Sequence, residues 1–419
     1  MNAYIISIGE ELLIGQTVNT NASWLAAQLN KVGVSVREIL VIPDQEQEII
    51  QAIRQASEKA DIVMITGGLG PTRDDVTKNA LCKIFDSPLI LNETVLNDII
   101  GFFQRKGLAI NELNRQQALV PEKAGFMRNP NGTAPGLWFT RHGRHYIAMP
   151  GVPYEMKEMV IKEVLPKLAG ENPDQHILHK TILTQGMGES FLAGKIARWE
   201  EDLPGFINLA YLPSPGIVKL RLSARGADPD LLKHAVEKAI TQLKELIPQY
   251  IWGYDGDTLE GLAGELLLGQ KMTLSTAESC TGGYVAHRIT SVPGSSSYFR
   301  GSVIAYDNKV KEDLLEVDEQ LISEHGAVSG EVATAMATGV KKRLNTDYAI
   351  GVTGIAGPSG GSEGKPVGTT WIAVTGQTKT RCQKHTFGDN RERNVLRATN
   401  AALALLLQVI KEEHPADES

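Results

Sequence analysis

The first part of the chain alternates between short apolar runs and amphipathic segments. The apolar runs at residues 3–8, 34–41 and 61–65 predict strands, because they are short and rich in β-branched residues. The stretches between them, 22–32 and 44–60, carry apolar residues at helical spacing. Alternating strands and helices predict a parallel sheet covered by helices, with ligands bound at the carboxyl ends of the strands.

The pattern changes twice further along the chain, and we therefore predict three domains. The first domain continues through a predicted hairpin and ends with a predicted helix at 153–168. The strands predicted after it are 177–184, 207–212, 217–224, 273–277, 302–306 and 348–353. The helices predicted after it are 189–199, 229–247, 258–268, 282–289, 329–344 and 391–411. The predicted fold is α/β: an α/β domain at 1–170, a small α+β domain at 176–250 and a second α/β domain at 256–414.

Composition narrows the class of protein. The 419 residues are 42% hydrophobic and 22% charged, without an apolar run near the roughly 18 residues of a membrane span. The net charge of −7 argues against a dedicated nucleic-acid surface. The start of the chain lacks the features of a secretory signal, which predicts a cytoplasmic protein. Cys82, Cys280 and Cys382 are too scattered for a disulfide framework or a metal-binding pair.

A glycine-rich turn at 67–70 lies between a predicted strand and a predicted helix at 76–85. Glycines let backbone N–H groups approach a ligand, and a helix start adds partial positive charge, so a phosphate is the natural occupant. Asp74 and Asp75 would repel that phosphate unless a divalent cation lies between them. Alternatively, Thr72 and the aspartates only cap the helix. Both interpretations remain open at this stage.

A second set of chemical residues lies in the last domain. Ser279 occupies a strand-to-helix turn, where a hydroxyl is electrostatically activated but still needs a base. Tyr306 and Lys311 follow the next predicted strand, and a lysine in the first turn of a helix is disfavoured as a cation, which favours a Ser/Lys pair. The structural alternatives are an inert Cys280, a capping serine and a solvated lysine. A third glycine-rich strand end, 351–358, suits a phosphate or an oxyanion.

The segments 9–16, 19–21, 67–75, 132–136 and 149–156 resemble the CinA family, whose first domain has a MoaB/Mog-type, molybdopterin-binding fold. The resemblance implies a pyrophosphatase that uses a divalent metal such as Mg²⁺ to split ADP-ribose into AMP and ribose 5-phosphate. It implies Glu10, Asp74 and Asp75 for the metal and the attacking water, with Asp75 catalytic. The residues that it places around the phosphates are Gly68, Gly70, Thr72, Gly132 and Thr133.

The last domain is similar to nicotinamide-nucleotide amidases through the segments 277–283, 306–311, 325–329 and 353–358. Such enzymes hydrolyse nicotinamide mononucleotide to nicotinate mononucleotide and ammonia, without a cofactor. The resemblance implies Ser279 as the nucleophile with Lys311 and Tyr306 as base and positioning group, and it favours Lys311 over Lys309; Thr281 remains an alternative nucleophile. The substrate-binding residues that it implies are Thr281, Gly282, Gly283, Asn308, Thr353 and Gly354.

The middle domain resembles the KH-like insert of the family, but residues 177–247 contain no Gly-x-x-Gly loop of the RNA-clamping kind. The working hypothesis is a bifunctional hydrolase of NAD by-products, with nucleotides as its small-molecule partners, no membrane partner, and a homodimer as the assembly that the resemblance implies. The alternatives are a binding module without turnover, a pterin-binding first domain, and an adaptor in DNA uptake or repair.

Overall fold

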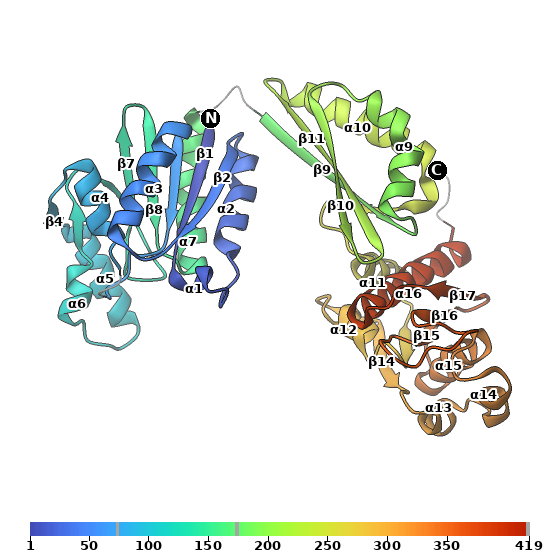
Figure 1. Ribbon diagram of the computed structural model, residues 1–419. Coiled ribbons are helices and arrows are strands. Elements are labelled where there is room, and N and C mark those ends of the chain that lie inside the picture. Colours follow the sequence, from blue (N-terminus) through green and yellow to red (C-terminus); the bar gives the residue numbers. More distant parts are fainter. Residues whose placement is uncertain (73–74, 172–175, 416–419) are drawn as a thin grey trace. The chain divides into compact units, whose positions relative to one another are not determined.

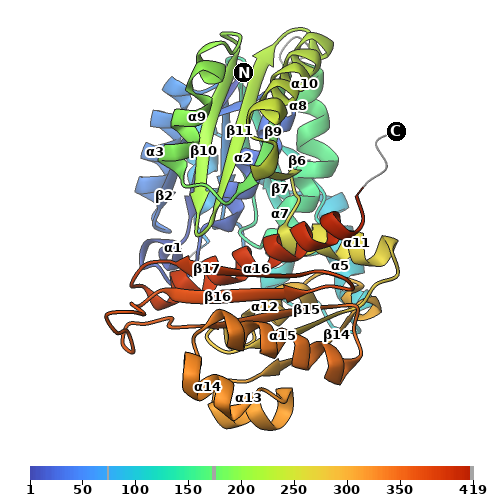
Figure 2. The same ribbon diagram turned by 90° about the vertical axis from the view of Figure 1, so that its right-hand side faces the viewer.

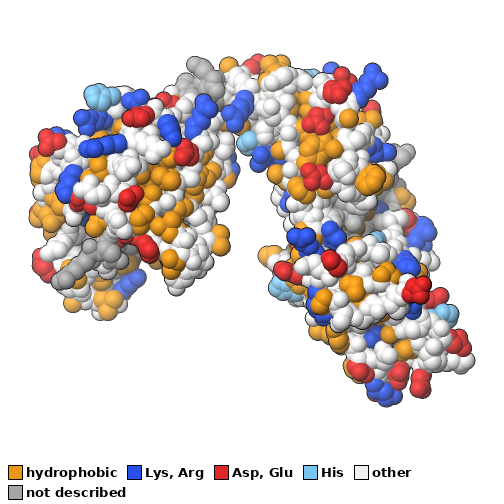
Figure 3. All heavy atoms as spheres, in the orientation of Figure 1, with side chains coloured by type: hydrophobic (Ala, Val, Ile, Leu, Met, Phe, Trp, Pro, Cys, Tyr) orange, Lys and Arg blue, Asp and Glu red, His pale blue; other side chains and the backbone are white. Residues whose placement is uncertain are grey.

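The computed structural model describes residues 1–72, 75–171 and 176–415 (Figures 1 and 2). The chain divides into two compact units, residues 1–178 with 224–233, and residues 179–223 with 234–419. In the part of the chain that is described, no helix combines the length and the apolar character needed to cross a membrane. On the face that Figure 3 shows, basic and acidic side chains are interspersed.

The N-terminal domain is built on a mixed six-stranded sheet with the order β2-β1-β3-β8-β7-β6. The first four of these strands are parallel neighbours, and β7 and β6 join antiparallel. The predicted parallel core is therefore present, with an antiparallel hairpin added at one edge. The strands are β1 (Asn2–Ile8), β2 (Ser35–Ile42), β3 (Ile62–Thr66), β6 (Gly125–Met127), β7 (Gly136–Arg141) and β8 (Arg144–Met149).

Helices cover both faces of this sheet because its central strands are apolar on both sides. Along β1, Tyr4 and Ile6 pack into one core with α3, α4 and α5 (Glu93–Arg105). Ala3 and Ile5 pack into the other core with α2 and the helical segment after β8. The helices are α1 (Glu10–Leu13), α2 (Thr20–Lys31), α3 (Glu46–Lys59), α4 (Thr77–Phe85) and α7 (Pro153–Met159), which continues through a π turn (Val160–Val164) into α8 (Leu165–Glu171).

The segment between α4 and β6 has structure for which the sequence analysis made no prediction. It contains β4 (Leu89–Leu91), α5 (Glu93–Arg105), α6 (Glu112–Gln116) and β5 (Leu119–Pro121). Strands β4 and β5 pair antiparallel as a separate small sheet. Asn92 caps α5 by accepting hydrogen bonds from the N–H groups of Thr94 and Val95, which fixes the start of that helix. Helices α5 and α6 lie together in the cyan part of Figure 1.

The middle domain is a small α+β unit, as predicted. Its four-stranded sheet has the order β10-β11-β9-β12, and Trp199 of α9 donates its indole N–H to the Ala239 carbonyl of α10 at 3.0 Å. The elements are β9 (His176–Gln185), α9 (Glu189–Glu201), β10 (Ile207–Ser214), β11 (Ile217–Gly226), α10 (Pro229–Leu246), a 3₁₀ turn (Pro248–Tyr250) and β12 (Ile251–Tyr254).

The C-terminal domain is a second three-layer α/β domain, so the predicted fold class is confirmed. Its sheet has the order β14-β13-β15-β16-β17, in which β14, β13 and β15 are parallel and β16 and β17 are antiparallel additions. The strands are β13 (Leu274–Glu278), β14 (Phe299–Ile304), β15 (Tyr348–Gly354), β16 (Thr369–Thr375) and β17 (Thr380–Thr386).

One face of the C-terminal sheet packs against α11, α12 and α16, and the other face packs against α13, α14 and α15. The helices are α11 (Leu259–Gly269), α12 (Tyr284–Thr290), α13 (Asn308–Leu315), α14 (Glu319–His325), α15 (Gly330–Leu344) and α16 (Arg391–Glu413), with a 3₁₀ turn at Ser295–Ser297. The prediction of a strand at 302–306 was wrong in its bounds, because β14 ends at Ile304 and Tyr306 follows it in the loop before α13.

Candidate functional site

A cavity of about 550 Å³ lies at the carboxyl ends of the central strands of the N-terminal domain. Its wall includes the glycine turn after β3, Asp75, and the 132–133 loop, which the sequence analysis had placed together. Further wall residues for which the sequence made no prediction are Glu11, Asp44, Phe102, Phe103, Asn114 and Glu155. Of these, Asp44 had a readable signal, because it follows the carboxyl end of β2.

The glycine turn holds a conformation that other residues do not tolerate. Gly67 and Gly68 have φ angles of 114° and 65°. A Cβ at Gly67 would lie 2.2 Å from the Ile8 carbonyl oxygen, and one at Gly68 would lie 2.2 Å from Thr77 Oγ1. Thr77 Oγ1 also donates a hydrogen bond to the Gly67 carbonyl oxygen at 3.1 Å. The turn therefore packs closely against β1 and the start of α4, and its residues line the cavity.

Asp75 and Thr72 are bound to each other. The backbone N–H of Thr72 donates to Asp75 Oδ2 at 2.9 Å, and the Thr72 hydroxyl donates to the same oxygen. Asp75 therefore closes the turn and does not cap α4, because no side chain bonds the start of that helix, which Val76 precedes. Gly70 packs against this carboxylate, since a Cβ there would lie 2.5 Å from Asp75 Oδ2. Asp74 lies outside the described residues.

The predicted metal role of Glu10 stays a prediction. Glu10 begins α1 with its N–H donating to Asp44 at 3.1 Å, while the neighbouring Glu11 is the residue on the cavity wall. Within the described residues, no three histidine, cysteine or acidic side chains gather closely enough to hold an ion. The carboxylates of the wall are oxygen donors, the chemistry that Mg²⁺ prefers, and Mg²⁺ commonly completes its shell with substrate phosphates. The donor set thus fits a hard divalent cation shared with a phosphate ligand.

Glu155 is a buried carboxyl group on the wall of the same cavity. It is 9% exposed and accepts a hydrogen bond from Asn129 Nδ2 at 2.7 Å. Burial raises the pKa of the Glu155 carboxyl, although the bond from Asn129 and the charge of Lys106 act in the opposite direction. Gly132 lies directly against it, since a Cβ there would be 2.3 Å from Glu155 Oε2. The loop with Gly132 and Thr133 therefore adjoins a buried carboxyl group whose pKa is raised by burial.

The second candidate site lies where three strands of the C-terminal domain end together. The Ser279 N–H donates to the Val352 carbonyl at 2.9 Å, and the Ala305 N–H donates to the Glu278 carbonyl at 2.8 Å. This register brings Ser279 after β13, Tyr306 after β14 and Thr353 in β15 to the same edge of the sheet. The structure thus juxtaposes residues that lie far apart in the sequence.

The buried carboxylate of Glu278 holds the turn that follows Ser279 through hydrogen bonds to backbone N–H groups. Glu278 is fully buried and accepts hydrogen bonds from the backbone N–H groups of Gly283, Val285 and Ala286 at 2.8–3.0 Å. These bonds satisfy the start of α12, so the Gly283 amide is already occupied. The Gly282 N–H donates to the Ser279 carbonyl at 3.1 Å. The predicted contacts of both glycines with a substrate stay predictions.

Lys311 is the most unusual group at this edge. Its side chain is 1% exposed, which rejects the solvated-lysine alternative. Its Nζ donates to the carbonyl oxygens of Tyr306 at 3.2 Å and Asp307 at 3.4 Å, and to Asn308 Oδ1 at 3.5 Å. Burial lowers the pKa of the Lys311 ammonium, and the charges of Asp307 and Cys280 only partly oppose this. The structure therefore makes Lys311 a more available base than an exposed lysine.

Two hydroxyl groups and a thiol follow one another in the turn after β13, at Ser279, Cys280 and Thr281. Ser279 is 8% exposed and Thr281 is 5% exposed, and Thr281 Oγ1 is buried without a hydrogen-bond partner in the described part of the chain. Burial raises the pKa of the Cys280 thiol to about 12, which makes it a poor nucleophile, as the structural alternative predicted. The hydroxyls of Ser279 and Thr281 therefore remain the two candidates for the nucleophile.

Arg391 is a site residue that the sequence analysis missed. It begins α16, and its guanidinium donates to Tyr306 Oη at 3.1 Å and to the Gly357 carbonyl at 3.0 Å. It thereby joins Tyr306, which is 61% exposed, to the glycine-rich loop after β15. Thr353 Oγ1 donates to the Ala327 carbonyl at 2.7 Å. A backbone loop, an arginine and a phenol thus frame the edge at which Ser279 lies, which suits an anionic substrate.

Gly354 and Asn308 complete the set of predicted residues. Gly354 ends β15 against β16, where a Cβ would lie 2.7 Å from the Thr369 carbonyl oxygen. Asn308 begins α13 and contacts Lys311 through its side chain. Both lie at the same end of the sheet as Ser279, and their contacts with a substrate stay predictions.

Family models match all three parts of the chain: "Probable molybdopterin binding domain" at residues 4–170, "Damage-inducible protein CinA KH domain" at 179–253 and "CinA C-terminal domain" at 256–410. A CinA-like protein from Flavobacterium psychrophilum is 46% identical over 415 residues, covering 98% of this chain and 99% of the relative. One from Cytophaga hutchinsonii is 44% identical over 410 residues, 98% of both chains.

Two solved structures each cover 40% of the chain. The crystal structure of the protein CinA from Thermoplasma acidophilum is 37% identical and covers 40% of this chain and 97% of its own, with a TM-score of 0.37. The molybdopterin biosynthesis enzyme MoaB from Thermus thermophilus is 15% identical over 40% of this chain and 96% of its own, with a TM-score of 0.27. On the full-length similarity to the CinA-like proteins, the chain belongs to the CinA family.

Proposed function

We propose that this chain is a bifunctional hydrolase of NAD by-products. Its C-terminal domain would deamidate nicotinamide mononucleotide to nicotinate mononucleotide and ammonia. Its N-terminal domain would hydrolyse ADP-ribose to AMP and ribose 5-phosphate with a divalent metal. The observation that carries the first activity is the buried Lys311, whose ammonium is destabilised at the sheet edge where Ser279 lies.

The proposed amidase uses side chains alone. Lys311 in its neutral form takes the proton of the Ser279 hydroxyl as the oxygen adds to the carboxamide carbon. The tetrahedral intermediate then expels the amine, which leaves as ammonia with the proton that Lys311 returns. Water hydrolyses the resulting serine ester, with Lys311 again taking a proton, and releases nicotinate mononucleotide and free Ser279. Arg391 and Tyr306 would hold the anionic part of the substrate.

The N-terminal proposal rests on the glycine turn and the carboxylates that share one cavity. Backbone N–H groups of residues 68–70 and 132–133 would bind the diphosphate. A carboxylate of the wall such as Asp75 would hold the metal together with oxygen atoms of the diphosphate, and the metal would supply charge neutralisation and an activated water. Glu155 adjoins the 132–133 loop as a buried carboxyl group whose pKa is raised by burial.

One protein preparation tests both halves. Ammonia release from nicotinamide mononucleotide should persist with chelator and should fall at least about a thousand-fold in Ser279→Ala, consistent with loss of a nucleophile in a coupled pair. AMP release from ADP-ribose should require the metal and should be lost in Asp75→Asn. Each variant is the control for the other, because each should silence only its own reaction. If the folded protein catalyses neither reaction, the chain is a binding module without turnover. Binding of a pterin to the N-terminal domain would then identify its ligand.

A further inference from the structure

The N-terminal cavity has an aromatic wall that the phosphate and metal chemistry does not explain. Phe102 and Phe103 at the end of α5, with Asn114 of α6, line the same cavity as the glycine turn and the 132–133 loop. Figure 1 shows α5 and α6 side by side at one end of the domain. A diphosphate needs backbone N–H groups and cations, and an aromatic ring offers neither. A second part of the ligand is therefore expected on this wall.

The two rings are held in a fixed arrangement. Their centroids are 5.6 Å apart with an interplanar angle of 88°, an edge-to-face pair. Phe103 also packs against the core formed by α3, α4 and α5. The Nζ of Lys106 lies 4.1 Å from the centroid of Phe102, so a cation covers part of that ring. Both rings are half-buried and line the cavity.

Asn114 is fixed in place by the start of its own helix. Its N–H donates to Asn111 Oδ1 at 2.8 Å, and its Oδ1 accepts from the Asn111 N–H at 3.4 Å. In residues 1–72, 75–171 and 176–415, Asn114 Nδ2 has no acceptor within hydrogen-bonding distance. An asparagine amide suits the edge of a purine, to which it can donate and from which it can accept. This donor lies on the cavity wall beside the rings.

Charge links the aromatic wall to the phosphate side of the cavity. Lys106 is close enough to Glu155 to oppose the rise in the pKa of that carboxyl. The charge of Lys106 thus acts on Glu155, which adjoins Gly132, while its Nζ lies over the ring of Phe102. A ligand with an aromatic base and a diphosphate would meet aromatic rings and backbone N–H groups within one cavity of about 550 Å³.

We infer that Phe102 and Phe103 form the nucleobase subsite of this cavity, and that Asn114 reads the edge of a purine stacked on them. The inference deepens the proposed pyrophosphatase and rests on it for the identity of the substrate. It assigns the adenosine end of the substrate to the α5–α6 segment and the reacting diphosphate to the glycine loops. The site therefore selects purine nucleoside diphosphate sugars over diphosphates without a base.

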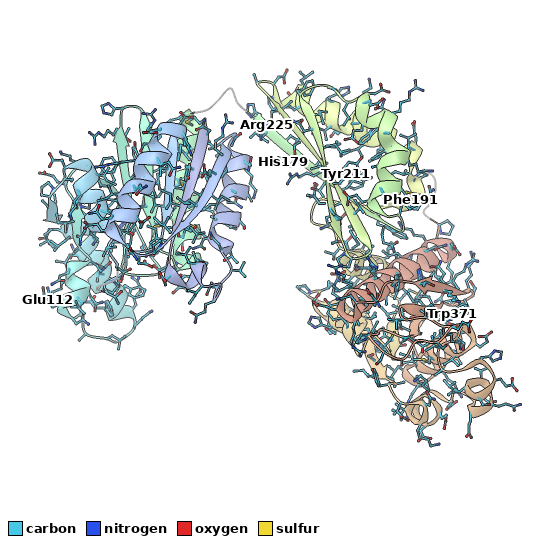
Figure 4. All side chains as sticks on the ribbon, viewed as in Figure 1. Glu112, His179, Phe191, Tyr211, Arg225 and Trp371 are labelled. Atoms are coloured by element: carbon cyan, nitrogen blue, oxygen red, sulfur yellow. The ribbon has the colours of Figure 1, made fainter. Side chains whose placement is uncertain are left out.

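The test compares Phe102→Leu and Phe103→Leu with wild type on two substrates. These are ADP-ribose and a diphosphoribose that carries methyl in place of adenosine. Base stacking is worth about 1–3 kcal/mol, so KM for ADP-ribose should rise about 5- to 150-fold in each variant, with kcat little changed. Kinetics on the base-free substrate should not change. Leucine keeps the apolar volume but removes the π face, and Phe191→Leu is the matched control, because Phe191 is 77% exposed on α9 (Figure 4).

Calorimetric binding of AMP separates this inference from the proposed function, because it needs no turnover. Weaker AMP binding in the two variants supports the subsite even if ADP-ribose is not hydrolysed. Asn114→Ala should reduce the preference for AMP over CMP. The inference is overturned if wild-type protein binds neither AMP nor ADP-ribose, if both leucine variants match wild type, or if they lose the two substrates equally.

Discussion

Replacing Lys311 with methionine should separate catalysis from folding. Methionine keeps the length and apolar stem of the buried side chain and removes the amine. The three bonds that Nζ makes are 3.2–3.5 Å long, at or beyond the usual range, so each contributes less than about 1 kcal/mol. Loss of those bonds is offset in part because a buried cation no longer has to be desolvated. We expect the free energy of unfolding to change by less than about 2 kcal/mol.

The same substitution should have a much larger effect on ammonia release. A positioned general base contributes about 10²–10⁴-fold to a rate, equivalent to about 2.7–5.4 kcal/mol of the barrier. In wild type, kcat/KM should rise with pH until Lys311 is deprotonated, which occurs below the ordinary range of a lysine because burial lowers the pKa of its ammonium. This ascending limb should disappear in Lys311→Met.

Lys309→Met supplies the matched control. Lys309 lies on the same helix and forms ion pairs at 3.1 Å with Glu312 and Asp313, with an exposed side chain. Its loss should leave kcat/KM within about two-fold, because exposed ion pairs contribute little. Ammonia release and urea unfolding would be measured on both variants. Unchanged kcat/KM in Lys311→Met, or an equal loss in Lys309→Met, would refute the assignment of the base.

Three further substitutions test the framework around the two sites. Glu278→Gln should lower the urea-unfolding free energy by about 1–3 kcal/mol, because the three amides at the start of α12 lose a charged acceptor; an unchanged midpoint would contradict this. For Glu155, the raised folded-state pKa means that its stabilisation is present at low pH and is lost as pH rises through that pKa. Glu155→Gln should flatten this part of the stability–pH curve, and an unaltered slope would remove Glu155 as its source. Gly351→Ala should destabilise the C-terminal domain by more than about 2 kcal/mol in thermal melts, because its Cβ would lie 2.3 Å from the Ala333 carbonyl oxygen of α15. A melting temperature equal to that of wild type would contradict this, because it would mean that α15 shifts at little cost.

Much of the fold was readable from the chain because the central strands are short apolar runs between amphipathic helices. The predicted helix at 391–411 is α16 (Arg391–Glu413), and the predicted strand at 348–353 is β15 (Tyr348–Gly354). The strand before Tyr306 was placed too late, since Gly301, at a φ of 144°, interrupts the apolar pattern near the start of β14. Periodicity therefore locates buried elements better than it locates the ends of an edge strand.

The sites were less predictable because their chemistry depends on contacts between distant segments. The sequence identified Lys311, but only the fold shows that its amine is buried against backbone carbonyls. Arg391 lies 85 residues from Tyr306, and nothing local in the sequence indicates that the two side chains meet. Glu155 looks like an ordinary first-turn acid of a helix until the Gly132 loop is seen to cover it.

The most direct test of the central claim is the mass of the peptide that carries Ser279 after rapid quenching of wild-type protein with nicotinamide mononucleotide. The mechanism predicts an ester adduct of the nicotinate nucleotide on Ser279, formed as ammonia appears and without added metal. The adduct should be absent from Ser279→Ala and present in Thr281→Ala. An adduct on Thr281, or continued ammonia release by Ser279→Ala at the wild-type rate, would contradict the account.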